Sequence, residues 1–220
     1  MNKKIIFDFD GTLLDVRERY YAVFCESCAV IGVPPLSKAV YLGLKERGKK
    51  DSQILEEEYN LSPDIVNRFK KHRYSILEES RYLDMDVLHT PVPALLKDLQ
   101  DKKYELILLS LRDNISASLA QLKKLGITDF FSTIVFTGPV VPGQSHALRK
   151  YQRLMEYFSP EELEGNYYVG DTMIDIETSS QLGTKMIFVD WGLDSVEKAD
   201  TSKISFMAED VTELRKILLK

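Results

Sequence analysis

The sequence predicts an α/β protein in which a helical segment is inserted into a domain built on a parallel β-sheet. Short apolar segments alternate with amphipathic segments from about residue 104 to the end of the chain. Buried parallel strands that are joined by helices produce this alternation. A similar apolar segment lies near the start of the chain, whereas residues 16–83 show helical patterns and no convincing strand.

The predicted elements of the sheet domain follow one another in a regular order. Strands are predicted where apolar, β-branched or aromatic residues form a short segment between turn residues. Helices are predicted where apolar residues recur at helical spacing, and two of them end at a glycine, Gly126 or Gly183. The predicted strands are Lys4–Phe9, Leu106–Ser110, Thr133–Phe136, Tyr167–Gly170 and Met186–Val189. The predicted helices are Asn114–Leu125, Ser145–Phe158, Ile174–Leu182 and Val211–Leu219.

The segment after the first strand predicts a small helical domain. It reads as three or four helices with breaks near Gly32, Gly48 and Ser62–Pro63. We therefore expect a core domain of residues 1–15 and 86–220 and an inserted helical cap of residues 16–85. The chain has only two cysteines, Cys25 and Cys28, which are too few for a four-ligand zinc site and are expected to be packed thiols.

Composition restricts the class of protein and its partners. The 220 residues are 44% hydrophobic and 29% charged, which is typical of a globular protein. The formal net charge of −5 disfavours broad binding to nucleic acid. No apolar segment approaches the roughly 20 residues of a membrane-spanning helix, and the apolar segment near the N-terminus is too short for a signal peptide. We expect a cytoplasmic protein that binds neither nucleic acid nor membrane, while its oligomeric state stays open.

The end of the first strand carries the strongest chemical signal. Two carboxylates, Asp8 and Asp10, lie one residue apart and are followed by Gly11 and the hydroxyl of Thr12. Side chains alternate along a strand, so the two carboxylates would share one face. A carboxylate and a neighbouring backbone carbonyl at a strand end can bind a small hard cation. A carboxylate beside a bound cation is also well placed to attack phosphorus.

Two later strands end in residues of complementary chemistry, and ligands bind beyond the carboxyl ends of parallel strands. Ser110 ends one strand and precedes Arg112 and a predicted helix, whose N-terminus can hold phosphate oxygens. Asp171 and Asp175 follow the strand that ends at Gly170 and lie about one helical turn apart. Crowded carboxylates repel one another without a cation. The expected Mg²⁺ ligands are Asp8, Asp171, Asp175 and the backbone carbonyl of Asp10.

These segments resemble the motifs of the haloacid dehalogenase (HAD) superfamily, whose members are mostly phosphatases. Asp8–Asp15 (DFDGTLLD) and Gly170–Asp175 (GDTMID) resemble two motifs, and Ser110 resembles a third. The resemblance extends over nearly the whole chain and implies a HAD-like Rossmannoid core with a C1-type helical cap, as in phosphoglycolate phosphatase-like members. It also implies that Asp8 is the nucleophile and Asp10 the general acid/base. The second aspartate favours a phosphatase or mutase over a dehalogenase, because an alkoxide leaving group needs a proton and a halide does not.

The family also places a lysine, often before proline, ahead of the second acidic pair, where it neutralises the nucleophile and the phosphate. The present sequence has no Lys-Pro in that segment. Lys150 lies about 20 residues before Gly170, close to the family's usual spacing. Gln144 and Arg149 are the alternatives. We expect Lys150 to fill the position, and without a cation there turnover is expected to be slow.

The basic segment Gly43–Lys50 resembles the part of phosphoglycolate phosphatase-like caps that faces the active site. Arg47 and Lys49 are expected to bind an anionic part of the substrate, with Lys50 as a further candidate, together with Thr12 and Arg112 of the core. The expected function is Mg²⁺-dependent hydrolysis of a small phosphorylated metabolite through an aspartyl phosphate. The expected catalytic residues are Asp8, Asp10, Ser110 and Lys150. A phosphosugar mutase of the same fold and a non-catalytic phosphate-binding protein are the alternatives.

Overall fold

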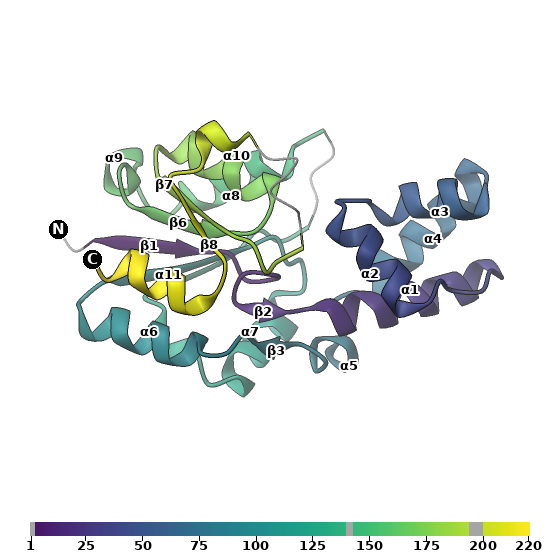
Figure 1. Ribbon diagram of the computed structural model, residues 1–220, viewed down its shortest axis with the longest axis horizontal. Helices are drawn as coiled ribbons and strands as arrows, with labels where there is room; N and C mark the ends of the chain where they lie inside the picture. Colours follow the sequence, from purple (N-terminus) through teal and green to yellow (C-terminus); the bar gives the residue numbers. More distant parts are fainter. Residues whose placement is uncertain (1–2, 140–142, 194–199) are drawn as a thin grey trace. The chain divides into compact units, whose positions relative to one another are not determined.

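A computed structural model describes residues 3–139, 143–193 and 200–220 and divides the chain into two compact units. Met1–Asp15 and Val87–Lys220 form the first unit, which we call the core, and Val16–Asp86 form the second, which we call the cap (Figure 1). The boundary expected from the sequence lay between residues 85 and 86. Each unit is described by itself.

A six-stranded sheet is the centre of the core, in the order β5-β4-β1-β6-β7-β8. Every pair of neighbouring strands in it is parallel. The α/β fold class predicted from the sequence is therefore confirmed. The strands are β1 Lys4–Phe7, β4 Glu105–Ser110, β5 Thr133–Phe136, β6 Tyr167–Gly170, β7 Lys185–Val189 and β8 Phe206–Ala208. The edge strand β8 was not predicted, and β1 ends before the two aspartates that were expected to share its face.

Helices cover both faces of this sheet (Figure 1). Helices α8 and α10 pack together on one face, and α6 and α11 pack together on the other. The core helices are α6 Val92–Asp101, α7 Ile115–Lys124, α8 His146–Leu154, α9 Pro160–Leu163, α10 Met173–Leu182 and α11 Val211–Leu218. A small antiparallel pair, β2 Leu14–Asp15 and β3 Val87–Leu88, lies beside the point where the cap is inserted. Helix α6 was not predicted, and the helix predicted to reach Phe158 ends at Leu154.

The sheet face under α8 and α10 determines where the functional side chains lie. Ile6 of β1 and Tyr168 of β6 are buried on this face together with Leu154 of α8 and Ile176 of α10. Because side chains alternate along a strand, Asp8 continues the face of Ile6 just beyond the end of β1. Its carboxylate is therefore directed toward the helices that cover this face.

The cap is a helical domain with its own apolar core. Within the fully described residues 16–86 its helices are α1 Arg17–Ile31, α2 Lys38–Glu46, α3 Asp51–Tyr59, α4 Pro63–Ile76 and the short α5 Ser80–Leu83. The ring of Phe24 lies 4.4 Å from that of Tyr41 and 5.8 Å from that of Phe69, measured between centroids. Cys25 and Cys28 are free thiols, and Cys28 is buried. Among the described residues of both units, no helix is long and apolar enough to cross a membrane.

Candidate active site

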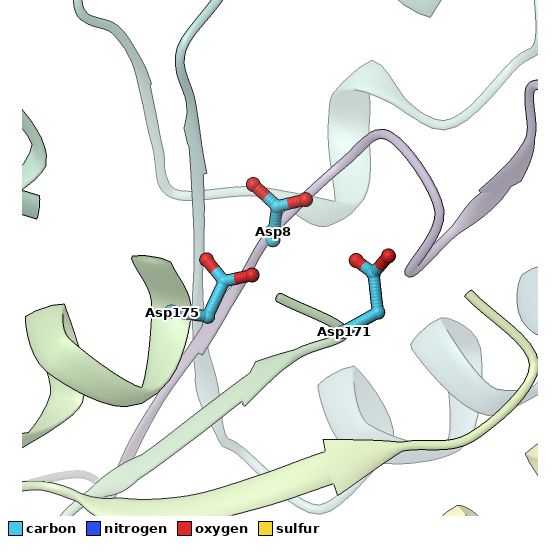
Figure 2. A group of neighbouring side chains, drawn as sticks. All are labelled: Asp8, Asp171 and Asp175. Atoms are coloured by element: carbon cyan, nitrogen blue, oxygen red, sulfur yellow. The ribbon is translucent and has the colours of Figure 1, made fainter. Parts of the chain in front are cut away.

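Three buried aspartates at the carboxyl ends of two neighbouring strands form the candidate site (Figure 2). Asp8 follows β1, whereas Asp171 and Asp175 follow β6, which pairs with β1. One oxygen from each carboxylate lies within 4.8 Å of the corresponding oxygen of the other two. Asp8, Asp171 and Asp175, which were expected to form one metal site, are thus adjacent in space.

Close backbone packing holds these carboxylates in place. A Cβ atom on Gly170 would collide with Asp175, and one on Gly11 would collide with Asp171. Gly170 is therefore needed for space. Thr172 caps α10 and donates hydrogen bonds to Asp175 Oδ2 from its backbone N at 3.0 Å and from its hydroxyl at 2.6 Å.

Lys150 places a buried positive charge beside these carboxylates. It projects from α8, is 2% exposed, and its Nζ lies 2.5 Å from Asp8 Oδ1 and 2.6 Å from Asp175 Oδ1. Lys150 also donates to the hydroxyl of Tyr168 at 3.2 Å, and this hydroxyl donates to Asp175 at 2.9 Å. Burial alone would lower the pKa of Lys150, but the Asp175 and Asp8 carboxylates outweigh burial and raise it well above its ordinary value. Lys150 is therefore charged.

The two other residues considered for this position have different partners. Arg149 is buried and pairs with Asp113 at 3.2 Å, and Gln144 hydrogen-bonds to Gln152 on the exposed side of α8. The start of the segment, Val141 and Pro142, lies outside the described residues. Of the three candidates, the geometry favours Lys150 as the cation opposite Asp8.

The carboxylates carry more negative charge than Lys150 balances. Burial raises the pKa of Asp8 to about 7, although Lys150 opposes this shift. Burial also raises the pKa of Asp171 well above its ordinary value, and repulsion by Asp8 and Asp175 adds to the effect. When all three carboxylates are deprotonated, one lysine leaves two negative charges, which a divalent cation would balance. Asp8, Asp171 and Asp175 fit Mg²⁺ in the type and charge of their donors.

The side chain of Asp10 lies outside this group of three. Its two carboxylate oxygens accept hydrogen bonds from Arg112, at 2.9 Å from Nε and 2.7 Å from Nη2. Arg112, which was expected to bind substrate, is 2% exposed and holds Asp10. Thr12, the other core residue expected to bind substrate, is fully buried and donates to Asp171 Oδ1 at 2.8 Å. These contacts join separate loops, so the sequence did not indicate them.

The remaining predicted residues lie in two places. Ser110 ends β4 and is buried at the same edge of the sheet as the aspartates. Arg47 and Lys49 lie in the cap, where Arg47 is the C-cap of α2. The Nζ atom of Lys49 lies 2.6 Å and 2.8 Å from the two carboxylate oxygens of Glu57.

Two neighbours of the site had no sequence prediction. The backbone N of Leu193 donates to Asp171 Oδ2 at 2.7 Å, a backbone contact that side-chain chemistry does not reveal. Tyr168 lies two residues before Gly170 on the face that carries the site, and this alternation is a signal that could have identified it. Trp191, which follows β7, donates from its indole N to the carbonyl of Thr12 at 3.1 Å.

The cap contains a basic cavity of its own, about 280 Å³ in volume. The lining residues are Lys45, Lys50, Asp51, Ser52, Lys70, Arg73 and Tyr74. Asp51 is buried, pairs with Arg73, and lies 3.2 Å from the Nζ atom of Lys45. Burial would raise the pKa of Asp51, but Arg73 and Lys45 hold it below its ordinary value. One carboxylate among four cationic side chains leaves the cavity positively charged.

If Asp8, Asp171 and Asp175 hold Mg²⁺, the ion should stabilise the protein against unfolding, because only the folded chain brings these carboxylates together. At a concentration about a hundredfold above Kd, Mg²⁺ should add about 2.7 kcal/mol, which is roughly 5–10 °C in Tm for a chain of this size. Asp171→Asn should abolish most of the shift, whereas Asp101→Asn, an exposed aspartate on α6, should retain it. Thermal unfolding with Mg²⁺ and with a chelator measures the effect, and an undiminished shift in Asp171→Asn would contradict the assignment.

The Mg²⁺ effect should also depend on pH. The pKa of Asp8 is raised to about 7, so the folded chain binds more protons than the unfolded chain between about pH 4 and pH 7. Without Mg²⁺, this carboxylate therefore lowers stability as pH rises through that range. Mg²⁺ requires the deprotonated form, so the Tm shift should grow between about pH 6 and pH 8. A shift that falls with pH would contradict this linkage.

The chain is similar in sequence and fold to known proteins. A family model described as haloacid dehalogenase-like hydrolase matches residues 5–189. A phosphoglycolate phosphatase from Synechococcus elongatus is 25% identical over 216 residues, which cover 96% of this chain and 94% of that protein. A haloacid dehalogenase-like family hydrolase from Streptococcus pneumoniae has a TM-score of 0.77 and 23% identity, with 98% of each chain covered. A protein described as a predicted phosphoglycolate phosphatase from Haemophilus somnus has a TM-score of 0.72 and 20% identity, with 98% of this chain and 97% of that chain covered. The similarities to these two solved structures show that the chain shares their fold.

Proposed function

Because this chain belongs to the haloacid dehalogenase-like hydrolase family, we propose that it is a Mg²⁺-dependent phosphatase that hydrolyses a small phosphomonoester. The observation that carries the proposal is the buried contact between Lys150 and Asp8, beside Asp171 and Asp175. This arrangement offers a nucleophilic carboxylate, a fixed cation and donors for a divalent ion. The phosphoglycolate phosphatase that shares 25% of its sequence supports the same class of reaction.

In the proposed reaction, a carboxylate oxygen of Asp8 attacks phosphorus and the bond to the leaving oxygen breaks. Lys150 hydrogen-bonds to Asp8 Oδ1, which leaves Oδ2 for the attack. Asp10 gives a proton to the leaving oxygen and then takes one from the water that cleaves the aspartyl phosphate. Lys150 and Ser110 bind the phosphoryl oxygens. Each turnover consumes one water and restores the Asp8 carboxylate.

The divalent ion would be held by the carboxylates of Asp8, Asp171 and Asp175 and by the carbonyl of Asp10. Bound there, Mg²⁺ would supply positive charge against the transferred phosphoryl group. Lys150, on α8, already balances part of the negative charge of the Asp8 and Asp175 carboxylates. We infer that the lysine and the ion share the neutralisation of a site that is otherwise strongly anionic.

The cap is proposed to recognise an anionic part of the substrate. Lys45, Lys50 and Lys70 line its cavity, and the buried Asp51 balances only part of their charge and that of Arg73. Exposed or half-exposed cations bind carboxylate and phosphate groups through charge-assisted hydrogen bonds. The basic lining is compatible with phosphoglycolate, sugar phosphates and nucleotides.

A panel of phosphorylated metabolites, assayed for released phosphate with Mg²⁺ and with a chelator, tests the proposed function. We expect Mg²⁺-dependent release from at least one ester that carries a second anionic group. Isomerisation of a sugar phosphate without net release would indicate a mutase. Binding of vanadate without turnover of any ester would indicate a non-catalytic protein.

A further inference from the structure

Arg112 is a buried arginine that forms two hydrogen bonds with Asp10, the proposed acid/base residue. Its Nε and Nη2 atoms donate to the two carboxylate oxygens of Asp10 at 2.9 Å and 2.7 Å. Two parallel hydrogen bonds between a guanidinium and a carboxylate fix both the distance and the plane of the carboxylate. A single charged group on a flexible stem would not restrict Asp10 in this way.

The guanidinium of Arg112 is itself fixed on two further sides. Its Nη1 atom donates to the side-chain oxygen of Gln121, a buried residue of α7. Its central carbon lies 4.5 Å from the centre of the Phe9 ring, an arrangement in which cation and ring attract each other. Phe9 is the residue between the two aspartates of the first motif. Arg112 therefore links the loop after β4 to the loop after β1.

This packing argues against direct contact between Arg112 and substrate. The Arg112 side chain is 2% exposed, whereas the Asp10 side chain is 18% exposed. Arg112 would have to leave Asp10, Gln121 and the Phe9 ring to reach a ligand. Asp10, in contrast, is partly accessible.

We propose that Arg112 is the positioning residue of Asp10, and that it holds the partly exposed carboxylate toward the oxygen that must receive or lose a proton. The inference rests on the proposed function, in which Asp10 exchanges protons with the leaving oxygen and with water. A displacement of about 1 Å in a reacting group lowers rates by about 100-fold. Losing the bidentate contact should therefore lower kcat/KM for an ester with a poor leaving group by a similar factor.

A double-mutant cycle on the full-length protein tests this assignment. Arg112→Lys, Asp10→Asn and the double variant are compared on an alkyl phosphate and on 4-nitrophenyl phosphate, whose leaving group needs no proton. Arg112→Lys should lower kcat/KM about 100-fold on the alkyl phosphate and less than about 10-fold on the aryl phosphate. The comparison uses kcat/KM because it covers the steps up to the aspartyl phosphate and leaves out the hydrolysis step, in which Asp10 acts on both substrates. In the Asp10→Asn background Arg112→Lys should have almost no further effect, because coupled residues act as a unit.

Gln121→Leu provides a second variant that removes one partner of Arg112 and leaves the contact with Asp10 possible. Its loss of kcat/KM should again be larger on the alkyl phosphate than on the aryl phosphate, but smaller than that of Arg112→Lys, about 10-fold on the alkyl phosphate. Equal losses of kcat/KM on both substrates, or losses that multiply in the double variant, would overturn the assignment. If the unsubstituted protein hydrolyses no ester, the proposed function fails and this inference fails with it. If it turns over normally but the losses of the two single variants multiply in the double variant, only the inference fails.

Discussion

Asp8→Asn should abolish phosphate release, lowering kcat/KM by about 10⁴-fold or more. An amide has no anionic oxygen with which to attack phosphorus, so no aspartyl phosphate can form. The variant should still fold, because burial raises the pKa of Asp8 to about 7 and thus already disfavours its charged form. An uncharged side chain of the same size also relieves repulsion with Asp171 and Asp175.

Steady-state release of phosphate measures this loss, and thermal unfolding confirms that the variant is folded. Asp101→Asn is the matched control, since it makes the same chemical change at an exposed position on α6. The control should keep full activity. Turnover in Asp8→Asn at more than about one percent of normal would exclude Asp8 as the nucleophile.

Lys150→Met should lower kcat/KM by about 10²–10³-fold, because it removes the fixed positive charge beside the nucleophile. The same change should lower the free energy of unfolding by about 3–5 kcal/mol in the absence of Mg²⁺, since it leaves the buried Asp8 and Asp175 carboxylates uncompensated. Protonation relieves this repulsion. The loss of stability should therefore be smaller at about pH 5 than at about pH 8.

Gln144→Ala is the control for Lys150→Met, because Gln144 was an alternative for the same position but bonds to Gln152 on the exposed side of α8. It should retain both activity and stability. Chemical denaturation at the two pH values and phosphate release with Mg²⁺ measure the effects. Unchanged kcat in Lys150→Met would show that no cation is required opposite Asp8.

The acidic residues of the site were predictable from sequence because they lie at the ends of apolar strands. Asp8 follows β1, Asp171 follows β6, and the carboxyl ends of parallel strands meet at one edge of a sheet. The family resemblance and the fold class are confirmed by the family match and by the structure. The roles of the individual residues in catalysis remain predictions.

Lys150 was harder to assign because three candidates lie in one short segment. What distinguishes Lys150 is its position on α8, in line with residues that face the core. Ser145 begins the helix by accepting a hydrogen bond from the backbone of Leu148 at 3.1 Å. Ala147, Lys150 and Leu154 then lie on one buried stripe at positions i, i+3 and i+7. A lysine within such a stripe is a signal that can be read from sequence.

The contact between Arg112 and Asp10 could not be predicted in this way. The two residues are 102 positions apart, and they meet only because two loops adopt particular conformations. The basic cavity of the cap has the same character, since its lining residues come from α2, α3, α4 and the loop before α3. Strand ends and helical phase are local patterns, whereas contacts between loops depend on the whole fold.

The most direct test of the account is whether Asp8 itself becomes phosphorylated. The protein is mixed with a substrate found in the metabolite panel and with Mg²⁺, stopped with acid within one turnover, and digested for peptide mass spectrometry. We predict a phosphoryl group on Asp8 that appears before free phosphate and is absent from Asp8→Asn. Phosphate release at the normal rate with no label on Asp8, or with the label on another residue, would contradict the account.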